Sequence, residues 1–277
     1  MAYRTNVHPI EHLRYIARAQ GADPISLARE TAIALGSLHA EPANLVIACR
    51  RIVERHPEAA PLWWLCSHLL TAEDPTELAW ALTDQLDDDP APGLIAAALP
   101  DEAVVLTIGW PATAGEALMR RGDVTVWCAD AAHHASSFMR RLERFGVACD
   151  PVPIENLARA AALADIVMID AAAASCERLL APIGSHVLAA VARSVGTPVW
   201  LAVGLGRRLP VEYVKEIASR VIDAARSGDA VVDVVVDDLP LDLVTHVVSC
   251  DGVSELVGQA LRPDCPCTPE LLRRSPI

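Results

Sequence analysis

Apolar residues recur at helical spacing through the first third of the chain. Two of the segments with this pattern begin with aspartate followed by proline, which is a strong helix start. The expected helices span residues 9–21, 23–38, 42–56, 60–72 and 74–88. The run DDDPAPG, residues 87–93, combines three acids with two prolines and is typical of a linker. We therefore expect an N-terminal helical domain over residues 1–99.

After this linker the pattern changes to short, nearly continuous apolar runs that alternate with helical segments. The expected strands span residues 103–109, 123–129, 147–152, 165–170, 197–204 and 230–236. The expected helices between them span residues 111–122, 133–146, 154–164, 184–196 and 210–228. This alternation is typical of a parallel sheet that is covered by helices on both faces. The predicted fold class is α/β, with a Rossmann-like parallel-sheet domain over residues 100–277 following the helical domain.

Composition limits the classes of partner. The chain has 277 residues, of which 52% are hydrophobic, so it can bury a large core. Its net charge of −13 argues against general affinity for nucleic acid. No segment approaches the roughly 18 uninterrupted apolar residues of a membrane helix, and the first residues lack the apolar part of a signal peptide. We expect a cytoplasmic protein with no nucleic-acid partner and no membrane partner.

Eight cysteines are scattered along the chain, mostly among apolar neighbours, where a reduced thiol behaves as a small hydrophobic residue. Cys265 and Cys267 are closely spaced, but two thiols without a second pair are a weak zinc signal. We expect no metal.

Ligands of open α/β sheets bind beyond the carboxyl ends of the strands, so the strand-to-helix turns are candidate sites. The turn at residues 107–115 carries Gly109 and Trp110. Its amides are able to bind an anion, although a tight turn uses the same residue types. It lacks the glycine pattern of dinucleotide sites, so we expect no cofactor. In the turn at residues 203–210, Arg207 and Arg208 either bind an anion or are solvated, and solvation is the favoured interpretation.

The turn at residues 128–141 brings Cys128, Asp130, His133 and His134 close together in sequence. Adjacent histidines on a helix point about 100° apart and rarely share an ion. Asp130 is more consistent with a helix cap. We therefore favour a polar pocket wall over a metal site.

The stretch IDAAAASCERLLAPIGSHVLAAVA, residues 169–192, places an acid at the end of a strand and Gly184-Ser185 at the start of a helix. Asp170 is either an acid–base group or a cap that accepts hydrogen bonds from loop amides. A ligand, if one binds, is expected among residues from three such turns, because these turns converge at one edge of the sheet. The expected wall consists of Trp110, Asp130, His134, Asp170, Gly184 and Ser185.

The run DIVMIDAAAASCERLLAPIGSHVLAAVARSVGTPVWLAV, residues 165–203, resembles a family signature. That family comprises the α, β and δ subunits of translation initiation factor 2B, methylthioribose-1-phosphate isomerase and ribose-1,5-bisphosphate isomerase. Residues 183–185 are similar to its Ile-Gly-Thr, residues 196–203 to the strand that follows, and residues 237–253 to its C-terminal segment. The resemblance runs from about residue 60 to 262 and is closer in order and spacing than in identity.

The departures from the isomerase members bear on function. Gly109 stands where the resemblance places their catalytic cysteine, and Asp130 stands where it places a substrate-holding arginine. Their Asn-Lys pair falls on Ala181-Pro182, and their catalytic aspartate matches Asp170 only if one extra loop residue is allowed. A phosphate dianion requires charge-assisted donors, so these replacements predict that the familiar isomerase chemistry is lost.

Three functional hypotheses follow. The first is an initiation factor 2B-like protein that has lost the sugar-phosphate isomerase residues and binds a small ligand or a partner protein. The second is an enzyme on the same scaffold that acts on a sugar or nucleoside-like substrate with Asp170 as acid or base. The third is an unrelated α/β protein. The resemblance also implies a homodimer that pairs through the Rossmann-like domain.

Overall fold

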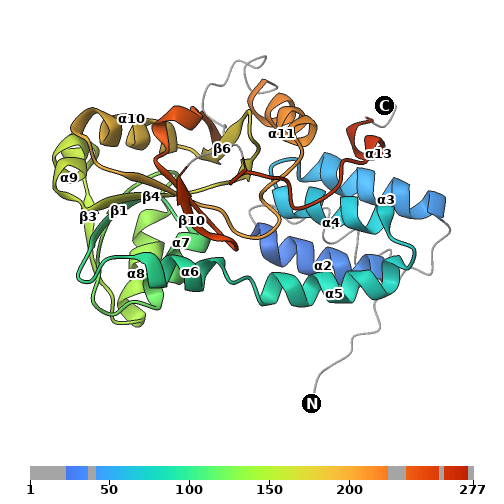
Figure 1. The fold of residues 1–277 in the computed structure, drawn as a ribbon, viewed down its shortest axis with the longest axis horizontal. Coiled ribbons are helices and arrows are strands. Elements are labelled where there is room, and N and C mark those ends of the chain that lie inside the picture. The colour runs from blue at the N-terminus through green and yellow to red at the C-terminus, as the bar shows by residue number, and fades with distance from the viewer. Residues whose placement is uncertain (1–22, 37–41, 224–234, 256–258, 274–277) are drawn as a thin grey trace.

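The computed structural model describes residues 23–36, 42–223, 235–255 and 259–273. Its N-terminal part is helical, as predicted (Figure 1). These helices are α2 (Pro24–Gly36), α3 (Pro42–Arg55), α4 (Ala60–Thr71) and α5 (Pro75–Asp87). The start of α5 follows from its sequence, since the Asp74 carboxylate accepts hydrogen bonds from the backbone N–H of Thr76 and Glu77. Helix α4 is the most buried, with Trp63 and Trp64 almost inaccessible to solvent.

The second part is a seven-stranded sheet in the order β10-β9-β7-β4-β1-β2-β3. Its strands are β1 (Val104–Ile108), β2 (Thr125–Ala129), β3 (Ala148–Val152), β4 (Ile166–Asp170), β7 (Val199–Ala202), β9 (His246–Ser249) and β10 (Gly252–Glu255). Every pair is parallel except β9 and β10. The fold is therefore α/β with a Rossmann-like sheet, as the alternating pattern predicts.

Helices cover both faces of this sheet (Figure 1). On one face lie α9 (Leu157–Leu163), preceded by the short helix η1 (Ile154–Asn156), and α10 (Ser185–Val195). On the other lie α6 (Ala91–Ala98), α7 (Ala112–Met119) and α8 (Ala135–Arg144). Because α6 begins at Ala91, the expected linker 87–93 contains its first turn, and only residues 88–90 lie between α5 and α6. The apolar residues of α6 pack against the sheet, which accounts for this difference.

A second, three-stranded antiparallel sheet was not predicted. It is formed by β5 (Ala173–Ala174), β6 (Leu179–Pro182) and β8 (Val236–Leu239). The segment between β4 and α10, expected to be a loop, thus contains two of these strands. The strand expected at residues 230–236 overlaps β8 only at Val236, and residues 230–234 lie outside the described residues, as does the helix expected at 9–21.

The C-terminal segment, residues 259–273, returns to the helical N-terminal part (Figure 1). Its short helix α13 (Pro269–Leu272) packs against α3, α4 and α11 (Val211–Ala218). Arg50 Nε donates to the carbonyl oxygen of Glu270 at 2.7 Å, and Ser67 Oγ donates to that of Pro266. The C-terminal segment therefore connects the sheet to the N-terminal helices. Among the described residues, no helix combines the length and apolarity needed to cross a bilayer.

Candidate functional site

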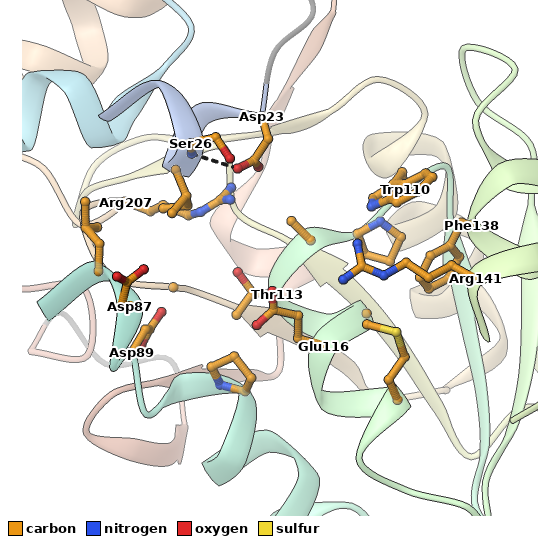
Figure 2. Close-up of a pocket in the computed structure, with 18 of the residues that line it drawn as sticks. Asp23, Ser26, Asp87, Asp89, Trp110, Thr113, Glu116, Phe138, Arg141 and Arg207 are labelled. Carbon is orange, nitrogen blue, oxygen red and sulfur yellow. Dashed lines mark hydrogen bonds between the residues drawn. The ribbon is translucent and has the colours of Figure 1, made fainter. Parts of the chain in front are cut away.

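Two adjacent cavities lie where the helical part meets the carboxyl ends of the sheet strands. Their volumes are about 410 Å³ and 450 Å³. Both are lined by Asp23, Trp110, Ala112 and Arg207. Figure 2 shows the first cavity, with Asp23 and Arg207 on one side and Trp110 on the other. The combined space is of the size that small-molecule sites occupy, so this junction is the candidate site.

Asp170, at the end of β4, lies in the wall of the second cavity and is 3% exposed. One carboxylate oxygen accepts a hydrogen bond from Thr113 N at 2.7 Å, and the other accepts one from Ala114 N at 3.0 Å. Both donors belong to the first turn of α7, where backbone amides lack helical partners. The carboxylate thus sits at a helix N-terminus, in the place that an anionic ligand would take.

The environment of Asp170 also changes its acidity. Burial raises the pKa of its carboxyl above the ordinary value, because the charged form loses solvation. The positive charge of Arg207 and the hydrogen bonds from the amides of α7 oppose part of this rise. A carboxyl with a raised pKa that borders a cavity is suited to donate a proton. Both interpretations of Asp170 from the sequence, as an acid–base group and as a cap on backbone amides, are therefore consistent with its surroundings.

Arg207 lies in the turn after β7 and is 7% exposed. Its Nη1 donates to the carbonyl oxygen of Ala171 at 2.6 Å. Its Nε is buried and has no hydrogen-bond partner among the described residues. Arg208 is equally buried and pairs with Asp264. The interpretation that these two arginines are solvated is therefore wrong, because the turn directs both side chains inward instead of to the surface.

Trp110 forms the apolar wall shared by the cavities and is 39% exposed. Its ring lies 6.0 Å from the ring of Phe138, centre to centre, and the Arg141 guanidinium lies 5.9 Å from its centre. These contacts, from α8, position the indole without covering it completely. Trp110 therefore presents a partly exposed flat surface to the site.

Four helices that begin near the site, α2, α7, α8 and α10, have a carboxylate of the protein itself at their first backbone amides. At the start of α2, Asp23 accepts from Ser26 N at 2.8 Å, and at α8, Asp130 accepts from Ala135 N at 3.1 Å. At α10, Asp237 accepts from His186 N at 3.0 Å. Together with Asp170 at α7, these carboxylates take up backbone N–H groups that would otherwise attract an anion.

The structure brings together some of the predicted wall residues. Trp110, His134 and Asp170 line the second cavity. Asp130 does not line either cavity, and its carboxylate caps α8 as the sequence indicated. His133 and His134 belong to the turn before α8. Among the described residues, no three His, Cys, Asp or Glu side chains gather as metal ligands would.

Gly184 and Ser185 lie at the start of α10 but are not among the cavity-lining residues. Gly184 has φ +89°, and a Cβ at this position would lie 2.6 Å from Ile108 Cδ1. It therefore allows close contact between α10 and the end of β1. Ser185 is fully buried, and its Oγ has no hydrogen-bond partner within the described part of the chain.

Sequence reasoning missed the contribution of the helical part. The sequence marks Asp23 only as a helix start, yet Asp23 borders both cavities. Glu58, from the turn before α4, lines the second cavity. No local pattern marks either residue as part of a site, because their position depends on how the helical part packs against the sheet. Arg207 did carry a signal, since an arginine directly after a buried strand stands where ligands bind.

The arrangement offers the incompletely paired guanidinium of Arg207, which borders both cavities, together with the buried Asp170 carboxyl and the flat surface of Trp110. Further carboxylates line the rim, and so does Arg29, whose Nε is also buried without a partner within the described residues. The arrangement can orient a small polar ligand against Trp110. The described lining residues of the two cavities include no cysteine nucleophile.

Comparison with known proteins gives similarity in structure alone, because no protein-family model matches the chain and its sequence matches no curated protein. The structure of the Pyrococcus horikoshii OT3 translation initiation factor eIF-2B aligns with a TM-score of 0.70 at 14% identity, covering 92% of this chain and 98% of that one. The tetrameric eIF2B-beta2-delta2 complex from C. thermophilum gives 0.66 at 15%, covering 91% of both chains. The eIF2B delta structure from Chaetomium thermophilum gives 0.62 at 16%, covering 90% and 99%. Over most of its length, this chain therefore has the fold of the eIF2B structures.

Proposed function

We propose that this chain is an initiation factor 2B-like protein that has lost sugar-phosphate isomerase chemistry and binds a small ligand at the junction of its two parts. The observation that carries this proposal is the position of the Asp170 carboxylate on the first amides of α7. A phosphate at that helix start would have to displace a buried carboxylate of the same charge sign.

Two further positions support the loss of isomerase chemistry. Gly109, which replaces the expected catalytic cysteine, has φ +66°, a backbone conformation that favours glycine. Asp130, which replaces the expected arginine, is committed to the amide of Ala135. A substrate phosphate would therefore meet a negative charge where the resemblance leads one to expect a positive one.

Inorganic phosphate tests the carrying observation directly. The Asp170→Ser variant frees the amides of Thr113 and Ala114 and removes one negative charge, so it should bind phosphate more tightly than the unmodified protein does in a calorimetric titration. Asp165→Ser is the matched control, because Asp165 caps the backbone N–H of Val104 at the opposite end of β1. Equal phosphate affinity in the unmodified protein and in Asp170→Ser, with both folded by circular dichroism, would contradict the proposal.

The same proposal predicts catalytic behaviour. The protein should show no turnover of methylthioribose 1-phosphate or of ribose 1,5-bisphosphate in a coupled or NMR assay. A thermal-shift panel of sugar phosphates, nucleotides and unphosphorylated sugars should place the largest stabilisation outside the sugar phosphates. Turnover of either isomerase substrate that disappears in Asp170→Asn would refute the loss of function.

A second candidate function is an enzyme that acts on an unphosphorylated sugar or nucleoside-like substrate. The observation in its favour is the raised pKa of the Asp170 carboxyl at a cavity wall. In that case Asp170 would transfer the proton, and Asp170→Asn would abolish turnover while a ligand still binds. If Asp170→Asn binds the ligand with the same affinity as the unmodified protein, and the unmodified protein shows no turnover, the binding function is favoured instead.

We also propose a homodimer that pairs through the Rossmann-like domain. Large apolar side chains are exposed on this domain, among them Phe145, Ile154, Leu163 and Val187. Exposed apolar residues of this size are common at subunit contacts. Light scattering should give twice the mass of one chain at micromolar concentration, and the mass of a single chain would refute the proposal.

A further inference from the structure

Arg207 is the one guanidinium that borders both cavities with its hydrogen bonding incomplete among the described residues. Its Nη1 donates to the Ala171 carbonyl oxygen, its Nε is buried without a hydrogen-bond partner, and no hydrogen bond of Nη2 to another described residue is seen. A buried charge with unused donors is costly unless an acceptor reaches it. The planar edge of two parallel N–H groups matches the two oxygens of a carboxylate.

The surroundings of Arg207 limit the charge of that acceptor. Asp23 shares both cavities with it, and Asp170 and Glu58 line the second. The second cavity sets these three carboxylates against one guanidinium among its described lining residues, that of Arg207, so a dianion bound there would be poorly balanced. In the first cavity, Arg29, Arg120 and Arg141 also line the wall. The helix starts nearby already hold carboxylates. A monoanion carries half of a dianion's repulsion from these carboxylates. On its side toward the second cavity, Arg207 should therefore accept a single carboxylate in preference to a phosphate ester.

The opposite wall defines the rest of the ligand. Across the first cavity from Arg207 lie Trp110 and Phe138, with Arg141 beside the indole (Figure 2). Because Trp110 is 39% exposed, part of its surface remains uncovered. A flat, largely apolar group on the indole would bury this surface while its acid group reaches Arg207.

We infer that the site binds a small monocarboxylate with a flat apolar body, held by the Nε–Nη2 edge of Arg207 and by the Trp110 ring. This inference rests on the proposed small-ligand function and names its ligand class. The amides of α7 take no part in binding this ligand, because they donate hydrogen bonds to the Asp170 carboxylate.

Four probes of similar size and different charge test the inference: benzoate, phenyl phosphate, benzamide and benzylamine. Binding to the full chain is measured by saturation-transfer NMR and titration calorimetry. Benzoate should bind more tightly than each of the other three. Replacing Arg207 by Gln should weaken benzoate binding about tenfold or more, since it removes a charge-assisted pair.

Matched variants separate a lost contact from a damaged fold. Arg144→Gln makes the same charge change at an exposed end of α8 that lines neither cavity, and it should leave benzoate affinity unchanged. Because Arg207→Gln also loses the bond to Ala171, Trp110→Ala provides a second test on a partly exposed residue. It should weaken benzoate, and Trp110→Phe should recover part of the loss.

The outcomes distinguish this inference from the proposed function. Tighter binding of phenyl phosphate or benzylamine than of benzoate, sensitive to Trp110→Ala, refutes the carboxylate class but leaves the small-ligand function intact. Benzoate affinity that is equal in the unmodified protein and in folded Arg207→Gln refutes the role of Arg207. Absence of binding by all four probes refutes the inference, and absence of any thermal shift across the wider ligand panel refutes the proposed function as well.

Discussion

Arg208 provides the strongest test of how the two parts of the chain are held together. Its side chain is 8% exposed and bonds to two acids, Asp264 at 2.6 Å and Asp251 at 2.5 Å. Asp264 is itself 11% exposed and belongs to the C-terminal segment that packs against the helical part. The Arg208→Gln variant would leave the Asp264 carboxylate buried without a cation. Removing one partner of a buried pair costs about 3–5 kcal/mol.

The two acids differ in a way that predicts unequal losses. Asp251 is 73% exposed, so water solvates it when Arg208 is absent, and the Asp251→Asn variant should cost at most about 1 kcal/mol. Arg208→Gln should lower the free energy of unfolding by several times as much. Urea denaturation followed by circular dichroism measures both values. A loss below about 1 kcal/mol for Arg208→Gln would show that the buried pair contributes no more than a surface pair does.

The loss should also depend on pH. Burial raises the pKa of Asp264, and Arg208 opposes that rise. Without Arg208 the folded-state pKa rises further, so the variant favours the protonated acid. A raised folded-state pKa gives stability that is present at low pH and is lost as the pH rises through that pKa. The loss of free energy of unfolding caused by Arg208→Gln should therefore be smallest in acid and grow toward neutral pH. A loss that does not change with pH would refute this account.

Two further predictions concern backbone and thiol groups. Gly184→Ala should lower the free energy of unfolding, measured by urea denaturation, by about 2–4 kcal/mol, because the new Cβ would contact Ile108 in addition to the strain of a positive φ. Gly196→Ala should cost about 1–2 kcal/mol, because φ there is +84° but a Cβ would have no neighbouring atom within 4 Å. Equal costs for the two variants would contradict the contact with Ile108. Burial raises the pKa of Cys128 and of Cys265 to about 12. Iodoacetamide at mildly alkaline pH should therefore label the exposed Cys176 long before these two, and early labelling of Cys128 by mass spectrometry would show that the turn opens in solution.

The fold was predictable where local patterns determine it. Alternation of apolar strands and amphipathic helices predicted the parallel sheet, and glycines at both ends of residues 184–196 marked α10, whose caps have positive φ at Gly184 and Gly196. The antiparallel β5-β6-β8 sheet was not predictable in this way. Its two-residue strand β5 pairs with β6, and residues 179–182 of β6 pair with residues 236–239 of β8. So short a strand and so distant a partner leave little local signal.

The site was predictable only on the sheet side. Trp110, His134 and Asp170 were found because strand ends of a parallel sheet converge. Asp23 and Glu58 come from a different part of the chain, and nothing in their own sequence context reveals the contact. The direction of Arg207 was also undetermined, since an arginine after a strand can turn outward or inward. Its orientation depends on the carbonyl of Ala171 and on the neighbouring carboxylate, which are tertiary features.

The aspartates at the helix starts connect the fold to the chemistry of the site. The backbone amides at a helix N-terminus attract anions. A carboxylate side chain of the same protein has a far higher effective concentration at those amides than a free ligand has. Asp170 holds the amides of Thr113 and Ala114, so on the proposed function it would compete with any phosphate for them. If the proposed function holds, a carboxylate at a helix start would disfavour phosphate there while the backbone of the cavity stays the same. Similarity of fold to the eIF2B structures does not by itself determine a ligand, because charges at a few positions of a shared fold can decide what a site binds.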